Sequence, residues 1–205
     1  MFITLEGPEG SGKTSHIPYL AGYLREKGHV VFPTREPGGT VISEQIREIL
    51  HDLKNAEMHP HTETLLYQAA RAQIVEQVIK PRLDDGEIVI SDRYYDSTIA
   101  YQGYGHRQNL EQVRQLVKYA TGGLDPDLTI LLDLDVKAGL KRKKQNGLEW
   151  NRMDAHEVEF YERVREGYLE MAKHEPDRWV LVDSGQPWED VQEELKKIIV
   201  ERINS

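Results

Sequence analysis

An eight-residue segment near the N-terminus has the residue types that bind the phosphates of a nucleotide. It matches G-x-x-x-x-G-K-[ST] and stands between an apolar run and a helix-like stretch. In such a loop the backbone N–H groups turn toward one centre, the helix N-terminus adds partial positive charge, and the lysine reaches the outer phosphates. The alternative is a glycine-rich turn that binds nothing. The pattern predicts a nucleoside triphosphate site with Mg²⁺ at Gly7, Pro8, Glu9, Gly10, Ser11, Gly12, Lys13, Thr14 and Ser15.

An acid and an arginine follow the third apolar run of the chain. Asp92 and Arg93 follow Ile88–Ile90 after a single serine, Ser91, at the strand end where open α/β sheets bind ligands. The Asp92 carboxylate and the Thr14 hydroxyl are oxygen donors that suit hydrated Mg²⁺, and Arg93 has the fork to bridge two phosphates. A structural ion pair at the strand end is the alternative.

Two further arginines indicate a second anion site. Arg35 follows the second apolar run and Arg47 lies on the next helix-like segment, and guanidinium forks suit phosphate oxygens. Tyr67 and Arg71 are four residues apart and share one face of a long helix-like segment. The alternatives are solvated arginines and the packing of a helix buried on two sides. Arg35 and Arg47, together with Arg93, favour a second substrate that already carries a phosphate.

The elements needed to position these side chains recur along the chain. Short, continuously apolar runs are typical of parallel strands that are covered on both faces. They are Phe2–Leu5, Val30–Phe32, Ile88–Ile90, Thr129–Leu132 and Trp179–Val182. Helix-like segments lie between them at about 13–27, 41–53, 62–84, 93–103, 109–121, 136–144, 154–174 and 188–203. The alternation predicts an α/β fold of three layers, a five-stranded parallel sheet flanked by helices.

Length, charge and composition argue against two classes of protein, nucleic-acid-binding proteins and membrane proteins. The chain has 205 residues, which fits a single domain over 1–205, and 26 Lys and Arg against 35 Asp and Glu, a net charge of −9. That balance speaks against non-specific nucleic-acid binding. Cysteine is absent, and no apolar run approaches the roughly 20 residues that cross a membrane. We expect a cytoplasmic protein with no nucleic-acid or membrane partner.

Residues 141–152 differ in amino-acid composition from the rest of the chain. They are rich in Lys and Arg, carry one acid and contain an Asn-Gly breaker. This composition predicts a mobile basic loop. A solvated basic loop with no role in binding is the alternative.

Taken in order and spacing, the motifs of this chain resemble those of thymidylate kinases. The resemblance runs from Phe2 to about Tyr168. It rests on Glu6 to Thr14, on Thr34-Arg35-Glu36-Pro37-Gly38-Gly39, on Leu66-Tyr67 with Arg71, on Asp92-Arg93-Tyr94 with Ala100-Tyr101-Gln102-Gly103, on Pro126-Asp127-Leu128-Thr129 and on Asn151-Arg152-Met153-Asp154. It implies the P-loop NTPase fold and transfer of the γ-phosphoryl of ATP to dTMP, giving dTDP for dTTP synthesis.

The resemblance also implies roles for single residues of the dTMP site. Tyr67 would stack on the thymine ring and Arg71 would donate to a thymine carbonyl. Thr98 and Gln102 would line the base pocket, and Tyr101 would crowd the 2′ position of the sugar. The dTMP phosphate would be held by Arg35, Arg47 and Arg93, and Glu9 would lie near the 3′-hydroxyl and the metal's waters.

The family likewise implies a catalytic set and an oligomeric state. Catalysis would involve Lys13, Arg93, Arg152 and Glu9. Arg152 would be supplied by a mobile basic lid at about residues 141–152, and Arg142 would lie along the adenine or phosphates of ATP. The loop lacks the internal arginine of eukaryotic-type members, which is the bacterial pattern. Family members pair as homodimers.

Two residues depart from the pattern of many relatives. Tyr67 replaces a phenylalanine, and Ala70 replaces an acid that precedes the arginine. The rival functions are another P-loop nucleoside monophosphate or deoxynucleoside kinase, and a regulatory or DNA-handling NTPase. The arginine set favours an acceptor that carries phosphate, and the acidic single domain disfavours a DNA-handling machine.

Overall fold

Within the described residues, five parallel strands form one sheet in the order β2-β3-β1-β4-β5. The computed structural model describes residues 1–145 and 152–204, with Asp154 and Ala155 described by their backbone alone. The strands are β1 (Phe2–Glu6), β2 (Val31–Arg35), β3 (Ile88–Asp92), β4 (Leu128–Asp133) and β5 (Trp179–Asp183). Every residue of β1 and β3 is buried, as continuous apolarity predicts for central strands.

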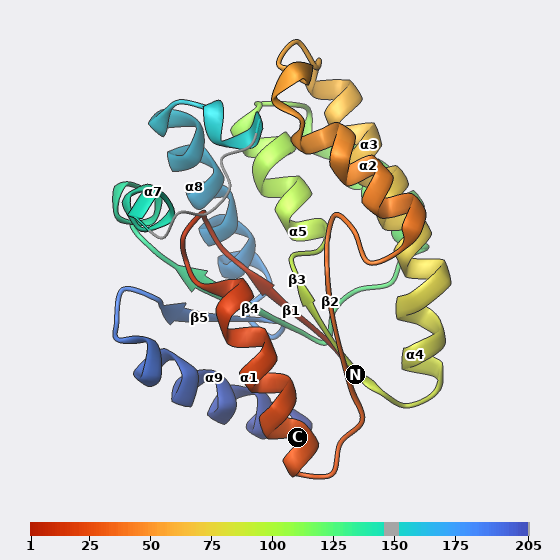
Figure 1. Cartoon of the computed structure of the whole chain (residues 1–205), viewed down its shortest axis with the longest axis vertical. Helices are drawn as coiled ribbons and strands as arrows, with labels where there is room; N and C mark the ends of the chain where they lie inside the picture. The colour runs from red at the N-terminus through yellow and green to blue at the C-terminus, as the bar shows by residue number, and fades with distance from the viewer. Residues whose placement is uncertain (146–151, 205) are drawn as a thin grey trace.

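Helices cover both faces of the sheet (Figure 1). Their bounds are α1 (Lys13–Glu26), α2 (Val41–His51), η1 (Leu53–Asn55), α3 (Pro60–Ile74), η2 (Val75–Ile79), α4 (Lys80–Asp84), α5 (Tyr95–Thr98), η3 (Ile99–Gly105), α6 (Leu110–Thr121), α7 (Val136–Gln145), η4 (Arg152–Ala155), α8 (Val158–His174) and α9 (Trp188–Ile203). On one face, α1 and α9 close one apolar cluster against the sheet. On the other, η2, η3, α6 and α8 enclose a second cluster.

The predicted three-layer α/β fold is confirmed, with differences at element ends. The predicted helix over 62–84 is α3 and α4 joined by the π-type turn η2, and the helix expected from 93 begins at Tyr95 and widens into the π-type turn η3. The strand expected to end at Phe32 continues to Arg35 because its backbone pairs with β3 as far as Asp92. The helix expected over 136–144 and the loop expected over 141–152 overlap, and residues 141–145 belong to the helix, at the end of α7. Of the remaining loop residues, Arg152 begins η4 and 146–151 lie outside the described residues.

Strand register brings the chemically interesting segments to one edge of the sheet. Leu5 of β1 pairs with Asp92 of β3, and Glu6 pairs with Leu131 of β4. The loop after β1 therefore begins beside the end of β3, as expected for the ligand-binding edge of a parallel sheet.

The two chain ends lie at the opposite edge (Figure 1). The Met1 ammonium donates to the Glu87 carbonyl at 3.2 Å, and Arg202 at the end of α9 donates to the Asp127 carbonyl at 2.9 Å. Among the described residues, no helix has the length and apolarity that a membrane crossing requires.

Candidate active site

The loop between β1 and α1 has the backbone of a phosphate cradle. Gly7, Gly10 and Gly12 have φ angles of 146°, 74° and 92°, which side chains with a Cβ rarely adopt. The ammonium of Lys13 donates to the carbonyls of Gly7 and Pro8 at 2.9 and 3.0 Å, so the lysine lies across its own loop. Burial and the neighbouring Arg93 lower the pKa of Lys13 to about 8. The loop therefore surrounds a buried cation at the start of α1.

Glu9 is the anionic centre of this loop. Its carboxylate forms ion pairs with Arg93 at 2.8 Å and with Lys143 of α7 at 3.3 Å, and it accepts from the Tyr101 hydroxyl at 3.1 Å. Burial opposes ionisation, but Arg93, Lys13 and Lys143 outweigh it and lower the pKa of Glu9 to about 2. Glu9 is therefore ionised, and its charge is balanced by Lys13 of α1, Arg93 after β3 and Lys143 of α7.

Arg93 connects the phosphate loop to α5. Its backbone has a φ of 70°, a left-handed conformation that is uncommon outside glycine. Its guanidinium donates to the Gly7 carbonyl at 3.2 Å and to the Ser97 hydroxyl at 3.0 Å, besides its pair with Glu9. One cation thus contacts both the loop and the helix that follows β3.

Thr14 and Asp92 lie together, as the sequence predicts for a metal site. The Thr14 hydroxyl donates to Asp92 Oδ2 at 2.5 Å, which joins the start of α1 to the end of β3. A hydroxyl and a carboxylate are both hard oxygen donors, the chemistry that Mg²⁺ selects. The two residues therefore fit a magnesium ion beside the phosphate loop.

Arg71 is one of the largest fully buried side chains of the protein. Its guanidinium donates to the Thr98 hydroxyl at 2.9 Å and to the Tyr94 carbonyl at 3.0 Å. It also forms an ion pair with Glu36 Oε2 at 2.7 Å, and burial raises the pKa of Glu36 although Arg71 opposes this. The acid that pairs with Arg71 is therefore Glu36, which directly follows β2.

The two arginines of the expected phosphate clamp lie close to one another. Arg35 makes a bidentate pair with Glu44, 2.9 Å to each oxygen, and its side chain is 49% exposed. Arg47 donates to the Pro37 carbonyl at 2.9 Å. Burial lowers the pKa of Arg47, and the nearby positive charge of Arg35 lowers it further. Arg35 is therefore an exposed cation and Arg47 a half-buried one, close enough for their charges to interact.

Glu63 accepts a hydrogen bond from Gln102 and lies near Tyr67. Gln102 donates its amide to Glu63 Oε1 at 2.8 Å. Burial raises the pKa of Tyr67, the Glu63 charge adds to this, and the charges of Arg152 and Arg93 oppose it. Tyr67 therefore lies near Glu63 and Arg152 on one side and near Glu9 and Arg93 of the phosphate loop on the other.

Arg152 does not contact the phosphate loop in this structure. It is buried, donates to Glu63 Oε2 at 2.5 Å and to the Leu50 carbonyl at 2.8 Å, and thus lies on the Tyr67 side of the site. Its neighbour Asn151 and the side chain of Asp154 lie outside the described residues.

Arg142 likewise lies away from the loop. It donates to the Ser184 carbonyl at 2.7 Å, in the turn after β5. The next residue, Lys143, is the α7 cation that reaches Glu9, and sequence reasoning did not select it. Glu63 was also missed, although it precedes Tyr67 by one helical turn and shares its face.

The chain is similar to known proteins over nearly its whole length. The family model "Thymidylate kinase" matches residues 5–195. A thymidylate kinase of Herpetosiphon aurantiacus is 47% identical, covering 95% of this chain and 93% of that protein. One from an Exiguobacterium species is 45% identical, covering 99% and 95%.

A solved structure agrees with the sequence comparisons. The crystal structure of thymidylate kinase from Ehrlichia chaffeensis superposes with a TM-score of 0.78 at 36% identity, covering 97% of this chain and 98% of that one. Each of these matches spans nearly the whole of this chain. The chain belongs to the thymidylate kinase family.

Proposed function

We propose that this protein transfers the γ-phosphoryl of ATP to dTMP, giving ADP and dTDP in dTTP synthesis. The observation that carries the proposal is the position of Arg93. Its guanidinium contacts the ATP-type loop at Gly7 and Glu9 and the second-substrate helix at Ser97 and Tyr101. A cation shared by two anion sites is what phosphoryl transfer between two bound nucleotides requires.

The loop and the strand ends would hold the donor. Backbone N–H groups of the non-proline residues among 7–15 and the Lys13 ammonium would bind the ATP phosphates, with Arg142 along the adenine or phosphates. Thr14 and Asp92 would hold Mg²⁺, which neutralises phosphate charge when bound. We propose direct in-line transfer, since no motif of the sequence positions a cysteine or histidine to accept the phosphoryl group.

The helices above β3 would hold the acceptor. Tyr67 would stack on the thymine ring, and Arg71, Thr98 and Gln102 would read its edge. Tyr101, which already bonds Glu9 and Arg93, would lie against the sugar. Arg35, Arg47 and Arg93 would hold the dTMP phosphate, Glu9 would lie near the 3′-hydroxyl, and Arg152 would act on the transferring group.

Purified protein tests the substrate assignment directly. ADP release is followed in a coupled assay with Mg²⁺, ATP and one acceptor at a time: dTMP, dUMP, dCMP, dAMP, dGMP or thymidine. We expect dTMP to give the highest kcat/KM, dTDP to appear in equal amount to ADP, and EDTA to stop turnover. Stronger turnover with another monophosphate or with thymidine would identify a different kinase, and ADP release without any acceptor would identify a hydrolase.

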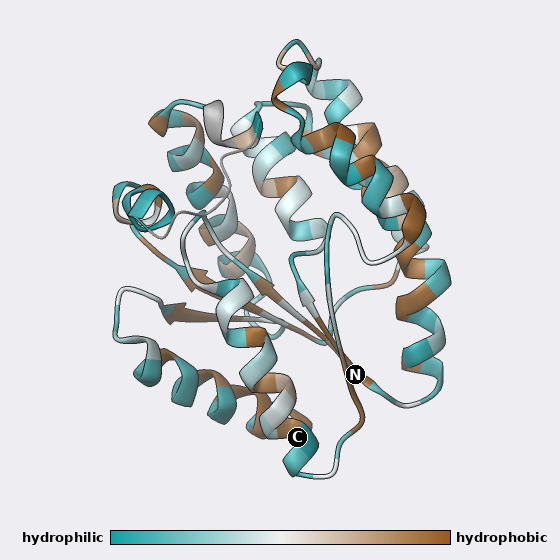
Figure 2. Cartoon of the chain, viewed as in Figure 1, coloured by the Kyte–Doolittle hydropathy of each residue, from teal (hydrophilic) through white to brown (hydrophobic). Residues whose placement is uncertain are grey.

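We also propose a homodimer, as the family resemblance implies. Exposed apolar side chains gather on neighbouring elements α2, η1 and α3, which pack together, and Figure 2 shows apolar segments along these helices. They are Ile42, Ile49, Leu53 and Leu65, between 46% and 55% exposed. Contiguous exposed apolar surface of this kind is typical of protein interfaces.

A further inference from the structure

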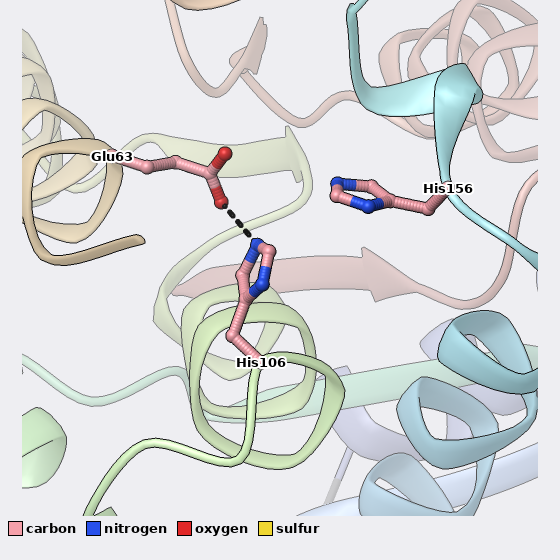
Figure 3. Close-up of side chains that lie close together, drawn as sticks. All are labelled: Glu63, His106 and His156. Carbon is pink, nitrogen blue, oxygen red and sulfur yellow. Dashed lines mark hydrogen bonds and ion pairs between the residues drawn. The ribbon is translucent and has the colours of Figure 1, made fainter. Parts of the chain in front are cut away.

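Three potential metal ligands converge beside the acceptor site. Glu63 projects from the first turn of α3, His106 follows η3, and His156 lies between η4 and α8. Figure 3 shows their side chains directed at one another. One ligand atom from each lies within 4.8 Å of those from the other two, and Glu63 Oε1 and His106 Nε2 are 3.1 Å apart.

His156 has a buried nitrogen that nothing in the described residues satisfies. Its ring stacks on Phe160 with centroids 4.1 Å apart and meets the His106 ring edge-on at 5.1 Å. Its Nε2 is buried and has no hydrogen-bond partner among the described residues. A buried imidazole nitrogen without a partner is costly, and the contacts of this ring with described residues are its packing against Phe160 and His106.

The donor set selects one class of cation. Two imidazoles and one carboxylate suit Zn²⁺, Co²⁺ and Ni²⁺, whereas Mg²⁺ and Ca²⁺ take oxygen ligands. Tetrahedral zinc with bonds of about 2.1 Å places its ligand atoms about 3.4 Å apart. Glu63 Oε1 and His106 Nε2 are within about 0.3 Å of that spacing. Because all three ligand atoms lie within 4.8 Å of one another, no pair has to close by more than about 1.4 Å.

The carboxylate of Glu63 is oriented by its other contacts. Gln102 donates to Oε1 at 2.8 Å, and Arg152 donates to Oε2 at 2.5 Å. An ion bound through Oε1 leaves the Arg152 bond to Oε2 in place, and that bond keeps the carboxylate oriented toward the ion. With three protein ligands, the fourth position is left for water.

We propose that Glu63, His106 and His156 form a binding site for one divalent transition-metal ion of the zinc type, separate from the magnesium site of Thr14 and Asp92. Because Arg152 shares the carboxylate, the site binds more weakly than a structural zinc site with four protein ligands.

Cobalt is the probe for this site, because its visible absorption reports the coordination number. Tag-free protein is titrated with Co²⁺, and Zn²⁺ or Mg²⁺ is then added in competition. We expect one Co²⁺ per chain with the intense bands of a four-coordinate ion, loss of the bands on adding Zn²⁺, and no loss with Mg²⁺. Bound ion adds RT ln(1 + [L]/Kd) to stability, so Zn²⁺ should raise the Tm of wild type.

Three variants separate this site from surface binding. His156→Ala and His106→Ala should lose the cobalt bands and the zinc-dependent rise in Tm, with circular dichroism confirming that they fold. His174→Ala is the matched control, because His174 pairs with Glu170 at 3.5 Å on the surface and is 75% exposed. It should bind as wild type does.

The proposal is overturned if wild type gives no four-coordinate spectrum, or if the His156→Ala and His106→Ala variants keep wild-type stoichiometry and affinity. Neither result bears on the dTMP kinase assay, which is run with Mg²⁺ and without transition metals.

Discussion

A single substitution at Arg71 tests whether this residue recognises the base of dTMP. Its guanidinium is held by Glu36, Thr98 and the Tyr94 carbonyl. Arg71→Ala removes the donor expected to meet a thymine carbonyl in a dry pocket. We expect the KM for dTMP to rise about 5- to 150-fold, corresponding to roughly 1–3 kcal/mol, with the KM for ATP nearly unchanged.

The same substitution leaves the buried Glu36 carboxylate without its cation, so urea unfolding is measured alongside. Glu36→Gln is the control, because it weakens the ion pair but keeps Arg71. Equal increases of both KM values in Arg71→Ala would instead show a purely structural arginine.

Arg152 poses a sharper question because the structure places it on Glu63. If it acts on the transferring phosphoryl group, Arg152→Ala should lower kcat by roughly 10²-fold or more with little change in either KM. Lys144→Ala, an exposed neighbour at the end of α7, is the control. A kcat within about threefold of wild type, together with a raised KM for dTMP, would show that Arg152 only supports the base pocket through Glu63.

Single residues also show where sequence reasoning stops. The Thr14–Asp92 contact was predictable, because both flank strands whose carboxyl ends share one edge. The pairs of Arg71 with Glu36 and of Glu9 with Lys143 were not, since each joins side chains far apart in the chain whose meeting depends on packing between helices. Motif spacing describes one element at a time and contains no information on such contacts.

At the scale of elements, the phosphate loop and α7 touch through two glycines. A Cβ added at Gly139 would meet the carbonyl oxygen of Glu9, and one added at Gly10 would meet the carbonyl of Gly139. This close approach is what brings Lys143, one turn further along α7, to Glu9. The helix therefore sets the position of the loop backbone.

Gly139→Ala should push the loop away from α7. Overpacking of this kind costs about 1–3 kcal/mol, so we expect a lower Tm and a raised KM for ATP, with the KM for dTMP less affected. Gly22→Ala is the matched control, since Gly22 lies in α1 with nothing within 4 Å of the added Cβ. It should keep wild-type kinetics and gain up to about 1 kcal/mol. An unchanged KM for ATP in Gly139→Ala would show that α7 does not set the position of the phosphate loop.

Element types were more predictable than element ends. Continuous apolar runs indicated all five strands because burial on both faces demands them. Periodicity could not show that the helix over 62–84 contains the π-type turn Val75–Ile79. Ile74, Val75 and Ile79 pack into one apolar cluster, and their spacing is also what a regular α-helix would give. Periodicity also placed a helix at Arg93, whose positive φ is set by its contacts with the loop.

At the scale of the whole molecule, a buried ion pair joins the C-terminal strand to the rest. Arg178, next to β5, donates to both oxygens of Asp96, at 2.7 and 3.0 Å, and Asp96 is fully buried. Arg178→Met leaves that carboxylate unpaired, so the free energy of unfolding should fall by about 3–5 kcal/mol in urea titrations. Lys197→Met breaks an exposed pair with Glu201 and should change it by less than about 1 kcal/mol. Similar small losses in both variants would refute a structural role for the buried pair.

Subunit pairing is the second property of the whole molecule. Sedimentation velocity should give the mass of two chains, and Ile49→Lys should shift it toward one by placing a charge in the α2–α3 face. Leu181→Lys is the control, because Leu181 is 49% exposed on β5 instead. A monomeric wild type at assay concentration, or dissociation by Leu181→Lys alone, would rule out this face as the interface.

The separation of the chain ends from the active site has a practical consequence. Met1 and the end of α9 lie beside the amino ends of the strands, whereas nucleotides are expected at the carboxyl ends. A fluorescent protein or a surface anchor fused at either end would therefore sit behind the catalytic face. Immobilised enzyme oriented in this way should keep its entrance open to solution, which suits it to flow reactors and to single-molecule observation of turnover.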